Sequence, residues 1–154
     1  IRCKNAGIHT AVDTSGYAKQ ADFERIANHT DLFLYDLKLA DDNLHRKYTG
    51  VGNSQIVSNL YWLDAANIPY VIRIPVVPDI TDTRENLDGL MQILKGLHHC
   101  GAVELLPYHN ISQHKYDRFG ISNRLHNIPT MSAHDLKPLV EKFGSQGFNI
   151  VINA

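Results

Sequence analysis

The chain has 154 residues, a formal net charge of -1 and 44% hydrophobic residues. This length and composition can bury one core, so we expect a single domain over residues 1–154. The small net charge and the scattered Lys and Arg residues provide no basic surface, which excludes nucleic acid and anionic lipid as expected partners. The apolar runs are strand-length and no charged-then-apolar leader opens the chain, which predicts a cytoplasmic protein with no membrane partner.

Strand and helix patterns alternate along the chain. Residues 1–7 are typical of the end of a helix that closes on a glycine, and the first residue is not Met, so we expect earlier elements to be missing. Asp41 and Asp42 are candidate caps of a short helix through Tyr48, and Asn53 is a candidate cap of the next helix. The other expected elements are strands 8–12, 32–35, 70–77, 102–106 and 148–152, helices 18–28, 54–66, 83–97 and 132–143, and a polar loop 108–130.

This alternation predicts an α/β fold with a parallel sheet and right-handed crossovers. The strand 70–77 supports it, because this strand is apolar on both faces except for Arg73, as in a parallel strand that is covered on both sides. The sheet is either open or curled into a partial (β/α) TIM-like barrel that lacks its first strands.

Two carboxylates, Asp13 and Asp36, follow expected strands and should meet at one rim of the sheet. Carboxylates this close repel unless one is protonated or a cation lies between them, and Thr14 can add a further oxygen ligand. The pair therefore predicts a bound cation. The alternative is that each Asp closes an Asx turn with its own backbone.

Three further side chains are candidates for the same rim. Lys38 lies two residues beyond Asp36 and should point the same way, either to bind a carboxylate or phosphate or to act as a Schiff-base amine. A guanidinium in an apolar strand needs a partner, so we expect Arg73 to contact Asp36, Glu104 or a ligand carboxylate. His109 ends the run 105–109, where it can hydrogen-bond a ligand or move a proton.

Five segments, taken together, resemble the glycyl-radical-enzyme activating enzymes of the pyruvate formate-lyase activating type, within the radical S-adenosylmethionine superfamily. They are His9–Gly16, Tyr35–Lys38, His45–Gly50 with Asn53, Arg73–Pro78, and Leu105–His109 with Lys115 and Tyr116. The resemblance implies a partial six-unit βα barrel that uses a 4Fe-4S cluster to cleave S-adenosylmethionine, after which a hydrogen atom is taken from a glycine of the partner. The implied partners are a glycyl radical enzyme such as pyruvate formate-lyase, and reduced flavodoxin or ferredoxin as electron donor.

The resemblance also implies roles for particular residues. Asp36, Leu37, Lys38, Arg73 and His109 would bind S-adenosylmethionine. Asp13, Thr14 and Asp36 would hold a monovalent cation beside the methionine carboxylate. The segment His45–Asn53 would shape the loop and helix after the second expected strand.

Two motifs of this family are absent from the chain. The chain has two cysteines, Cys3 and Cys100, and lacks the Cys-x-x-x-Cys-x-x-Cys motif that binds the cluster, as well as the Gly-Gly-Glu strand end. Such a cluster needs three thiolates from one loop, so we expect reduced thiols, no catalytic residue in this chain and no activity of the chain alone. The strand 8–12 would then be an unpaired edge, which predicts self-association or mobility near residues 1–20.

Two other functions fit parts of the pattern. One is an aldolase-like barrel in which Lys38 forms a Schiff base with a carbonyl substrate. The other is a non-catalytic module that only binds a partner protein. The aldolase leaves the two aspartates and Arg73 without a role.

Overall fold

Five parallel strands form one sheet in a computed structural model that describes residues 1–110, 116, 118–120, 125 and 127–153. The strands are β1 (Ala11–Thr14), β2 (Leu32–Asp36), β3 (Tyr70–Val76), β4 (Val103–Pro107) and β5 (Ile150–Ile152), and they lie side by side in chain order. This confirms the predicted α/β fold with a parallel sheet. The strand order never reverses, so the sheet winds in one direction, as in an open part of a barrel and unlike a doubly wound fold.

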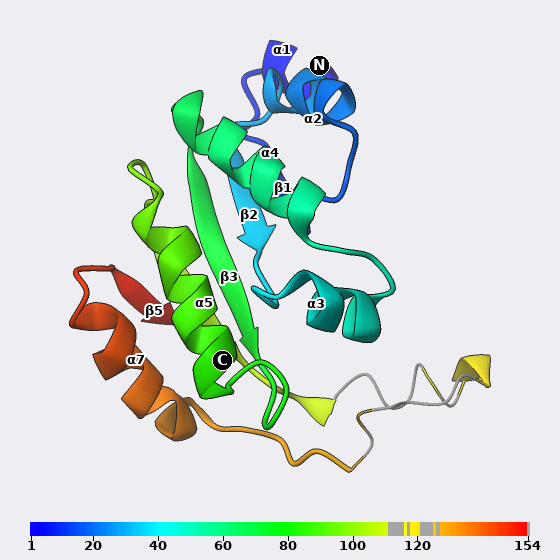
Figure 1. Ribbon diagram of the computed structural model, residues 1–154. Coiled ribbons are helices and arrows are strands. Elements are labelled where there is room, and N and C mark those ends of the chain that lie inside the picture. Colours follow the sequence, from blue (N-terminus) through cyan, green and yellow to red (C-terminus); the bar gives the residue numbers. More distant parts are fainter. Residues whose placement is uncertain (111–115, 117, 121–124, 126, 154) are drawn as a thin grey trace.

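The helices that follow the strands lie mainly on one face of this sheet (Figure 1). Helices α4, α5 and α7 cross the front of the sheet, whereas α3 lies beside the C-terminal end of β2. The bounds are α1 (Arg2–Asn5), α2 (Gln20–Ala27), α3 (Asp42–Thr49), α4 (Ser54–Ala65), α5 (Arg84–Lys95), η2 (Ala133–Leu136) and α7 (Lys137–Gly144).

The core lies between the sheet and these helices, and β3 shows why. Tyr70, Ile72, Ile74 and Val76 are buried, and the residues that alternate with them are partly exposed. Side chains alternate between the two faces of a strand, so one face of β3 meets the helices and the other is open. An aromatic cluster joins α2, β2 and α4 on the covered face, with the ring of Phe23 5.3 Å from that of Phe33 and 6.0 Å from that of Trp62. We expected both faces of β3 to be covered. The structure covers one face with helices and leaves the other partly exposed.

Several element boundaries differ from the expected ones. β1 begins at Ala11 instead of residue 8, because the backbone N–H and the hydroxyl of Thr10 both donate to Asp31 Oδ2 at 2.8 Å just before the strand. β5 is limited to three residues, and the expected helix 132–143 begins as the 3-10 turn η2. Within the described sheet β1 is an end strand, as expected. Lys115 and much of the polar loop 108–130 lie outside the described residues.

A buried carboxylate fixes the end of the sheet at which β3 begins. Asp64 on α4 is 4% exposed and accepts hydrogen bonds from Tyr70 Oη at 2.6 Å, His98 N at 3.0 Å and His99 N at 2.8 Å. Burial by itself raises the pKa of Asp64, but these hydrogen bonds outweigh it and the net pKa lies below 3.8. The ionised carboxylate therefore stabilises the fold.

The substitution Asp64→Asn should make the stability of the protein less dependent on pH. We expect it to lower the free energy of unfolding by about 1–3 kcal/mol at pH 7. The difference in unfolding free energy between the two proteins should have its full size above the unfolded pKa of Asp64, near 4. It should become smaller as pH falls through the lowered pKa of Asp64 in the folded state. Urea unfolding at pH 7, 5 and 3 measures it, and a difference that stays constant with pH contradicts the role of the ionised carboxylate.

Candidate functional site

Four charged side chains form one cluster where the open face meets the C-terminal ends of β2 and β3. Asp36 and Arg73 are register neighbours on these strands. Arg73 donates to Asp36 Oδ1 from Nε at 3.0 Å and from Nη2 at 2.7 Å, and Nη2 also donates to Asp13 Oδ1. Lys38 Nζ donates to Asp36 Oδ2 at 2.9 Å. The two carboxylates are thus bridged by a guanidinium, and the side chains of Lys38 and Asp36 lie on the same side of the sheet end, as predicted.

Burial in this cluster increases from Asp13 to Arg73. The side chain of Arg73 is 15% exposed and that of Asp36 20%, whereas that of Asp13 is 62% exposed. Burial alone lowers the pKa of Arg73, but the hydrogen bonds from its guanidinium to Asp13 and Asp36 outweigh burial and the net pKa is raised. The guanidinium is therefore permanently charged and held by two anions.

The structure decides between the expected partners of Arg73. Glu104 is its register neighbour on β4, yet the guanidinium forms its ion pairs with Asp13 and Asp36. Arg73 supplies the positive charge that the two aspartates were predicted to need. Within the described part of the chain no group of three His, Cys, Asp or Glu residues could hold a metal ion.

Three other candidates lie differently. Thr14 pairs with Tyr35 and so faces the helices, and its hydroxyl accepts from Gly16 N at 2.9 Å. Leu37 is buried in the core, with its N–H donating to Arg73 O at 2.9 Å. His109 is exposed beyond β4. The structure thus brings Asp13, Asp36, Lys38 and Arg73 together, and it leaves the side chains of Thr14 and Leu37 on the covered side.

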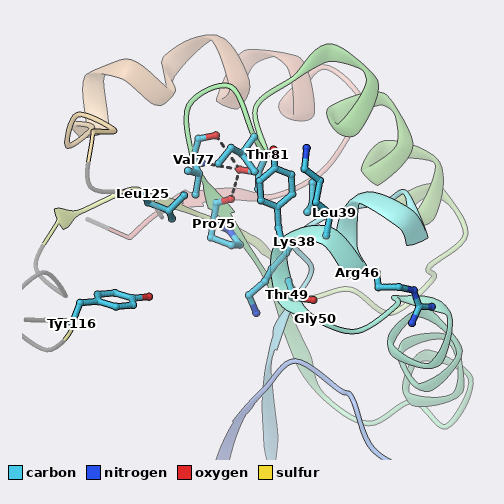
Figure 2. A pocket seen from close by; sticks show the side chains of 13 residues that line it. Lys38, Leu39, Arg46, Thr49, Gly50, Pro75, Val77, Thr81, Tyr116 and Leu125 are labelled. Carbon is cyan, nitrogen blue, oxygen red and sulfur yellow. Dashed lines mark hydrogen bonds between the residues drawn. The ribbon is translucent and has the colours of Figure 1, made fainter. Parts of the chain in front are cut away.

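A cavity of about 760 Å³ adjoins this cluster at Lys38. Figure 2 shows Lys38, Thr49 and Gly50 on one side of it and Pro75, Val77 and Thr81 on the other, while Arg46 turns away. Its walls come from the loop after β2, the C-terminal end of α3 and the loop after β3, and Tyr116 and Leu125 also line it. A space of this size and position can admit a ligand or a segment of another protein to the charged cluster.

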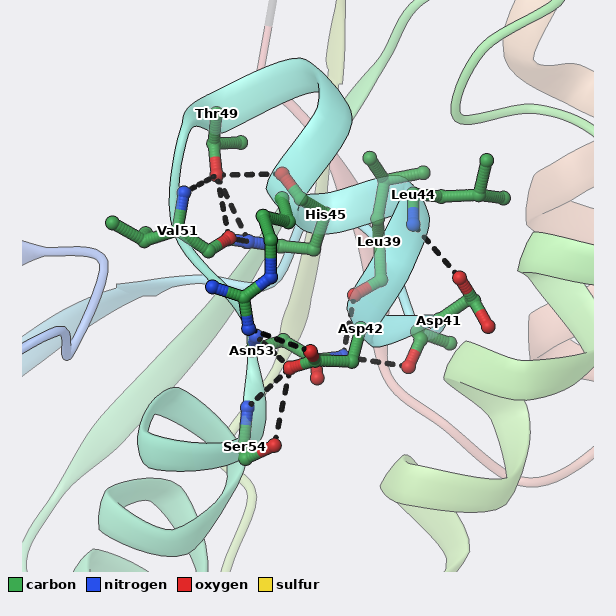
Figure 3. A network of polar contacts seen from close by, with 11 residues as sticks. Leu39, Asp41, Asp42, Leu44, His45, Thr49, Val51, Asn53 and Ser54 are labelled. Atoms are coloured by element: carbon green, nitrogen blue, oxygen red, sulfur yellow. Dashed lines mark hydrogen bonds and ion pairs between the residues drawn. The ribbon is translucent and has the colours of Figure 1, made fainter.

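The segment 45–53 builds one wall of this cavity through a polar network (Figure 3). His45 is buried and its Nδ1 lies 2.7 Å from Val51 O, which fixes the turn after α3. Asp42 Oδ1 accepts from Asn53 N at 2.7 Å and from Ser54 N at 3.3 Å. Asn53 occupies the expected N-cap position of α4, but its side chain forms no capping hydrogen bond. Asp42 accepts from the start of α4 instead, and Asn53 Nδ2 donates to Leu39 O and Ala40 O.

Sequence reasoning missed another buried asparagine beside this cavity, Asn86 in the first turn of α5, which is 4% exposed. A signal for it exists in the sequence. Asn86 occurs four and eight residues before Leu90 and Leu94, on the apolar stripe of α5, where a polar residue needs a buried partner.

Known proteins resemble this chain closely in sequence and in fold. It is 40% identical over 152 residues to the trans-4-hydroxy-L-proline dehydratase activating enzyme of Clostridioides difficile. This match covers 97% of this chain and 50% of that protein. It is 38% identical over 141 residues to the pyruvate formate-lyase-activating enzyme of Clostridium pasteurianum, with 92% and 58% covered. The crystal structure of a domain of pyruvate-formate lyase-activating enzyme from Bacteroides vulgatus ATCC 8482 superposes with a TM-score of 0.81 at 27% identity, over 99% of this chain and 86% of that one. No family model matches the chain.

The curated relatives that match this chain at 38–40% identity are glycyl-radical-enzyme activating enzymes. The chain spans about half the length of the curated relatives named above. Of the helices that the structure describes, none is long and apolar enough to cross a membrane.

The substitution Arg73→Met should destabilise the fold more than Asp13→Asn. Without Arg73 the mostly buried Asp36 loses its main partner, at a cost of about 2 kcal/mol in the free energy of unfolding. The largely exposed Asp13 should contribute less than about 1 kcal/mol. Urea unfolding at pH 7 measures both, and equal effects would show that burial does not set the strength of these pairs.

Proposed function

We propose that this chain provides the S-adenosylmethionine site of an activating enzyme that installs a glycyl radical in a partner such as pyruvate formate-lyase. The observation that carries the proposal is the cluster of Asp13, Asp36, Lys38 and Arg73 beside a cavity at the carboxyl ends of β2 and β3. In parallel α/β proteins ligands bind at these ends. The relatives named above act on glycyl radical enzymes by their names, which agrees with this partner class.

The charges of the cluster fit the amino-acid part of S-adenosylmethionine, which carries a carboxylate, an ammonium and a sulfonium. Arg73 and Lys38 are donors for the carboxylate, and Asp13 and Asp36 are acceptors for the positive groups. In this proposal the backbone of Leu37 holds the strand end, and His109 reaches the ligand from beyond β4. When bound beside a 4Fe-4S cluster, S-adenosylmethionine supplies the radical chemistry of the family.

The residues of this chain do not fit the iron-sulfur cluster itself. Cys3 is exposed, and Cys100 is partly buried with its pKa raised to about 11 by burial. Two thiols cannot supply the three thiolates that such a cluster requires. We therefore propose that the cluster ligands and the docking of flavodoxin or ferredoxin belong to residues outside this sequence, and that the chain alone is inactive. Self-association through the free edge of β1 also remains a proposal.

A monovalent cation at Asp13, Thr14 and Asp36 is part of the same proposal. Arg73 Nη2 bonds to one oxygen of each carboxylate, so a cation must share Asp13 with the guanidinium or displace it. Thr14 can contribute its backbone carbonyl, since its hydroxyl already accepts from Gly16. Asp13 is the most exposed member of the cluster, so replacing its contact to Arg73 with a contact to a cation disturbs the core least.

The aldolase alternative receives no support from these contacts. A Schiff-base lysine needs a free amine to attack the carbonyl, whereas Lys38 Nζ is engaged in an ion pair with Asp36 Oδ2 at 2.9 Å. The relatives named above are likewise activating enzymes.

Binding of S-adenosylmethionine tests the proposal. Calorimetry with this chain should show binding that falls by at least about tenfold in Asp36→Ala and in Arg73→Met, since each removes a charged hydrogen bond to the ligand or to its anchor. Arg84→Met, at an exposed residue of α5, is the matched control and should leave the affinity unchanged. Absence of binding by the unsubstituted chain would refute the ligand assignment. Borohydride trapping of a carbonyl substrate on Lys38 would favour the aldolase.

A further inference from the structure

Two loops form facing walls of the cavity beside the charged cluster. The loop after β2, residues 37–41, contributes Lys38 and Leu39. The loop after β3, residues 77–83, contributes Val77, Ile80 and Thr81. The separation of these loops sets both the width of the cavity and the place from which Lys38 reaches Asp36.

The side chain of Asn86 joins these two loops. Its Oδ1 accepts from Ala40 N at 2.8 Å, and its Nδ2 donates to Lys38 O at 3.2 Å and to Thr81 O at 2.8 Å. Both donor hydrogens of the amide are used, and the carbonyl oxygen is used as well. Asn86 therefore fixes the backbone on both sides of Leu39 and ties it to the opposite wall.

The contact at Thr81 continues into β3. The Thr81 hydroxyl donates to Pro75 O at 2.7 Å and accepts from Val77 N at 2.7 Å. The loop after β3 is thus fastened to the end of the strand that carries Arg73. Through Asn86 and Thr81, the backbone of Lys38 is linked to β3, the strand that carries Arg73.

We propose that Asn86 is a positioning residue that holds Lys38 at the charged cluster and sets the distance between the two cavity walls. The proposal rests on the proposed function, because it takes Lys38 as a ligand-binding residue. Asn86 lies in the core and acts on the ligand only through the backbone of Lys38 and the loop after β3.

Asn53 provides a matched comparison. It is as deeply buried as Asn86, and its Nδ2 also donates to two carbonyls, those of Leu39 at 3.0 Å and Ala40 at 2.6 Å. Both of these carbonyls belong to the loop after β2. The loss of Asn53 should release one wall, whereas the loss of Asn86 should release both.

Amide hydrogen exchange on this chain tests the link between the loops without any ligand. In Asn86→Ala we expect exchange to become faster by tenfold or more in both segments, 37–41 and 77–83, and in Asn53→Ala in segment 37–41 alone. If Asn86→Ala does not fold, Asn86→Asp replaces it, because it keeps the side-chain volume and the acceptor for Ala40 while losing both donors. Faster exchange in only one segment, or equal patterns in the Asn53 and Asn86 variants, would overturn the proposal.

Calorimetry with S-adenosylmethionine then tests the action through Lys38. We expect Asn86→Ala to weaken binding about tenfold in the unsubstituted background and less than about twofold in the Lys38→Met background, as for two residues that act as one unit. Asp64→Asn, a buried substitution at the other end of β3, should leave the affinity unchanged in both backgrounds. Equal losses in both backgrounds would show a merely structural role. If the unsubstituted chain does not bind, the ligand assignment fails and hydrogen exchange still decides whether Asn86 links the walls.

Discussion

The alternation of side chains along β3 separates the core of this protein from its charged cluster. Buried Ile72 and Ile74 face the helices, and Arg73 between them faces the open side of the sheet. Because the register aligns Asp36 with Arg73, the same alternation places both charges on one face. A shift of one residue in this register would put Arg73 into the core and an isoleucine on the open face, so the packing of the helices also fixes the geometry of the site.

The charged cluster contains two cations and two anions, so its formal charges balance. Arg73 and Asp36 are mostly buried, and each would be costly if left unpaired. A zwitterionic ligand can exchange its own carboxylate and ammonium for these internal partners without leaving a buried charge uncompensated. Asp13 and Lys38, the more exposed members, are best placed to change partners.

Polar side chains from the starts of three helices shape the loops around this cluster. Asp42 of α3 caps α4, Asn53 holds the loop after β2, and Asn86 of α5 joins that loop to the one after β3. Loop backbone carries polar groups that must be paired when buried, and short amide and carboxylate side chains from fixed helix ends provide those partners. These helix ends thereby hold the loops in the positions that form the cavity.

The sequence by itself determined the order of strands and helices, the parallel sheet and the presence of Asp36, Lys38 and Arg73 at neighbouring strand ends. These features depend on local periodicity and on the shared direction of parallel strands, which a sequence displays directly. Tertiary structure alone decided that Arg73 bridges Asp13 and Asp36 instead of pairing with Glu104, and that β1 begins at Ala11. It decided as well that the side chain of Asn53, the N-cap residue of α4, bonds to the loop after β2 instead of to the helix. It also decided the role of Asn86, whose partners Ala40 and Lys38 lie 46 and 48 residues away in the chain. Such contacts depend on which backbone groups packing brings together, and no local pattern records that.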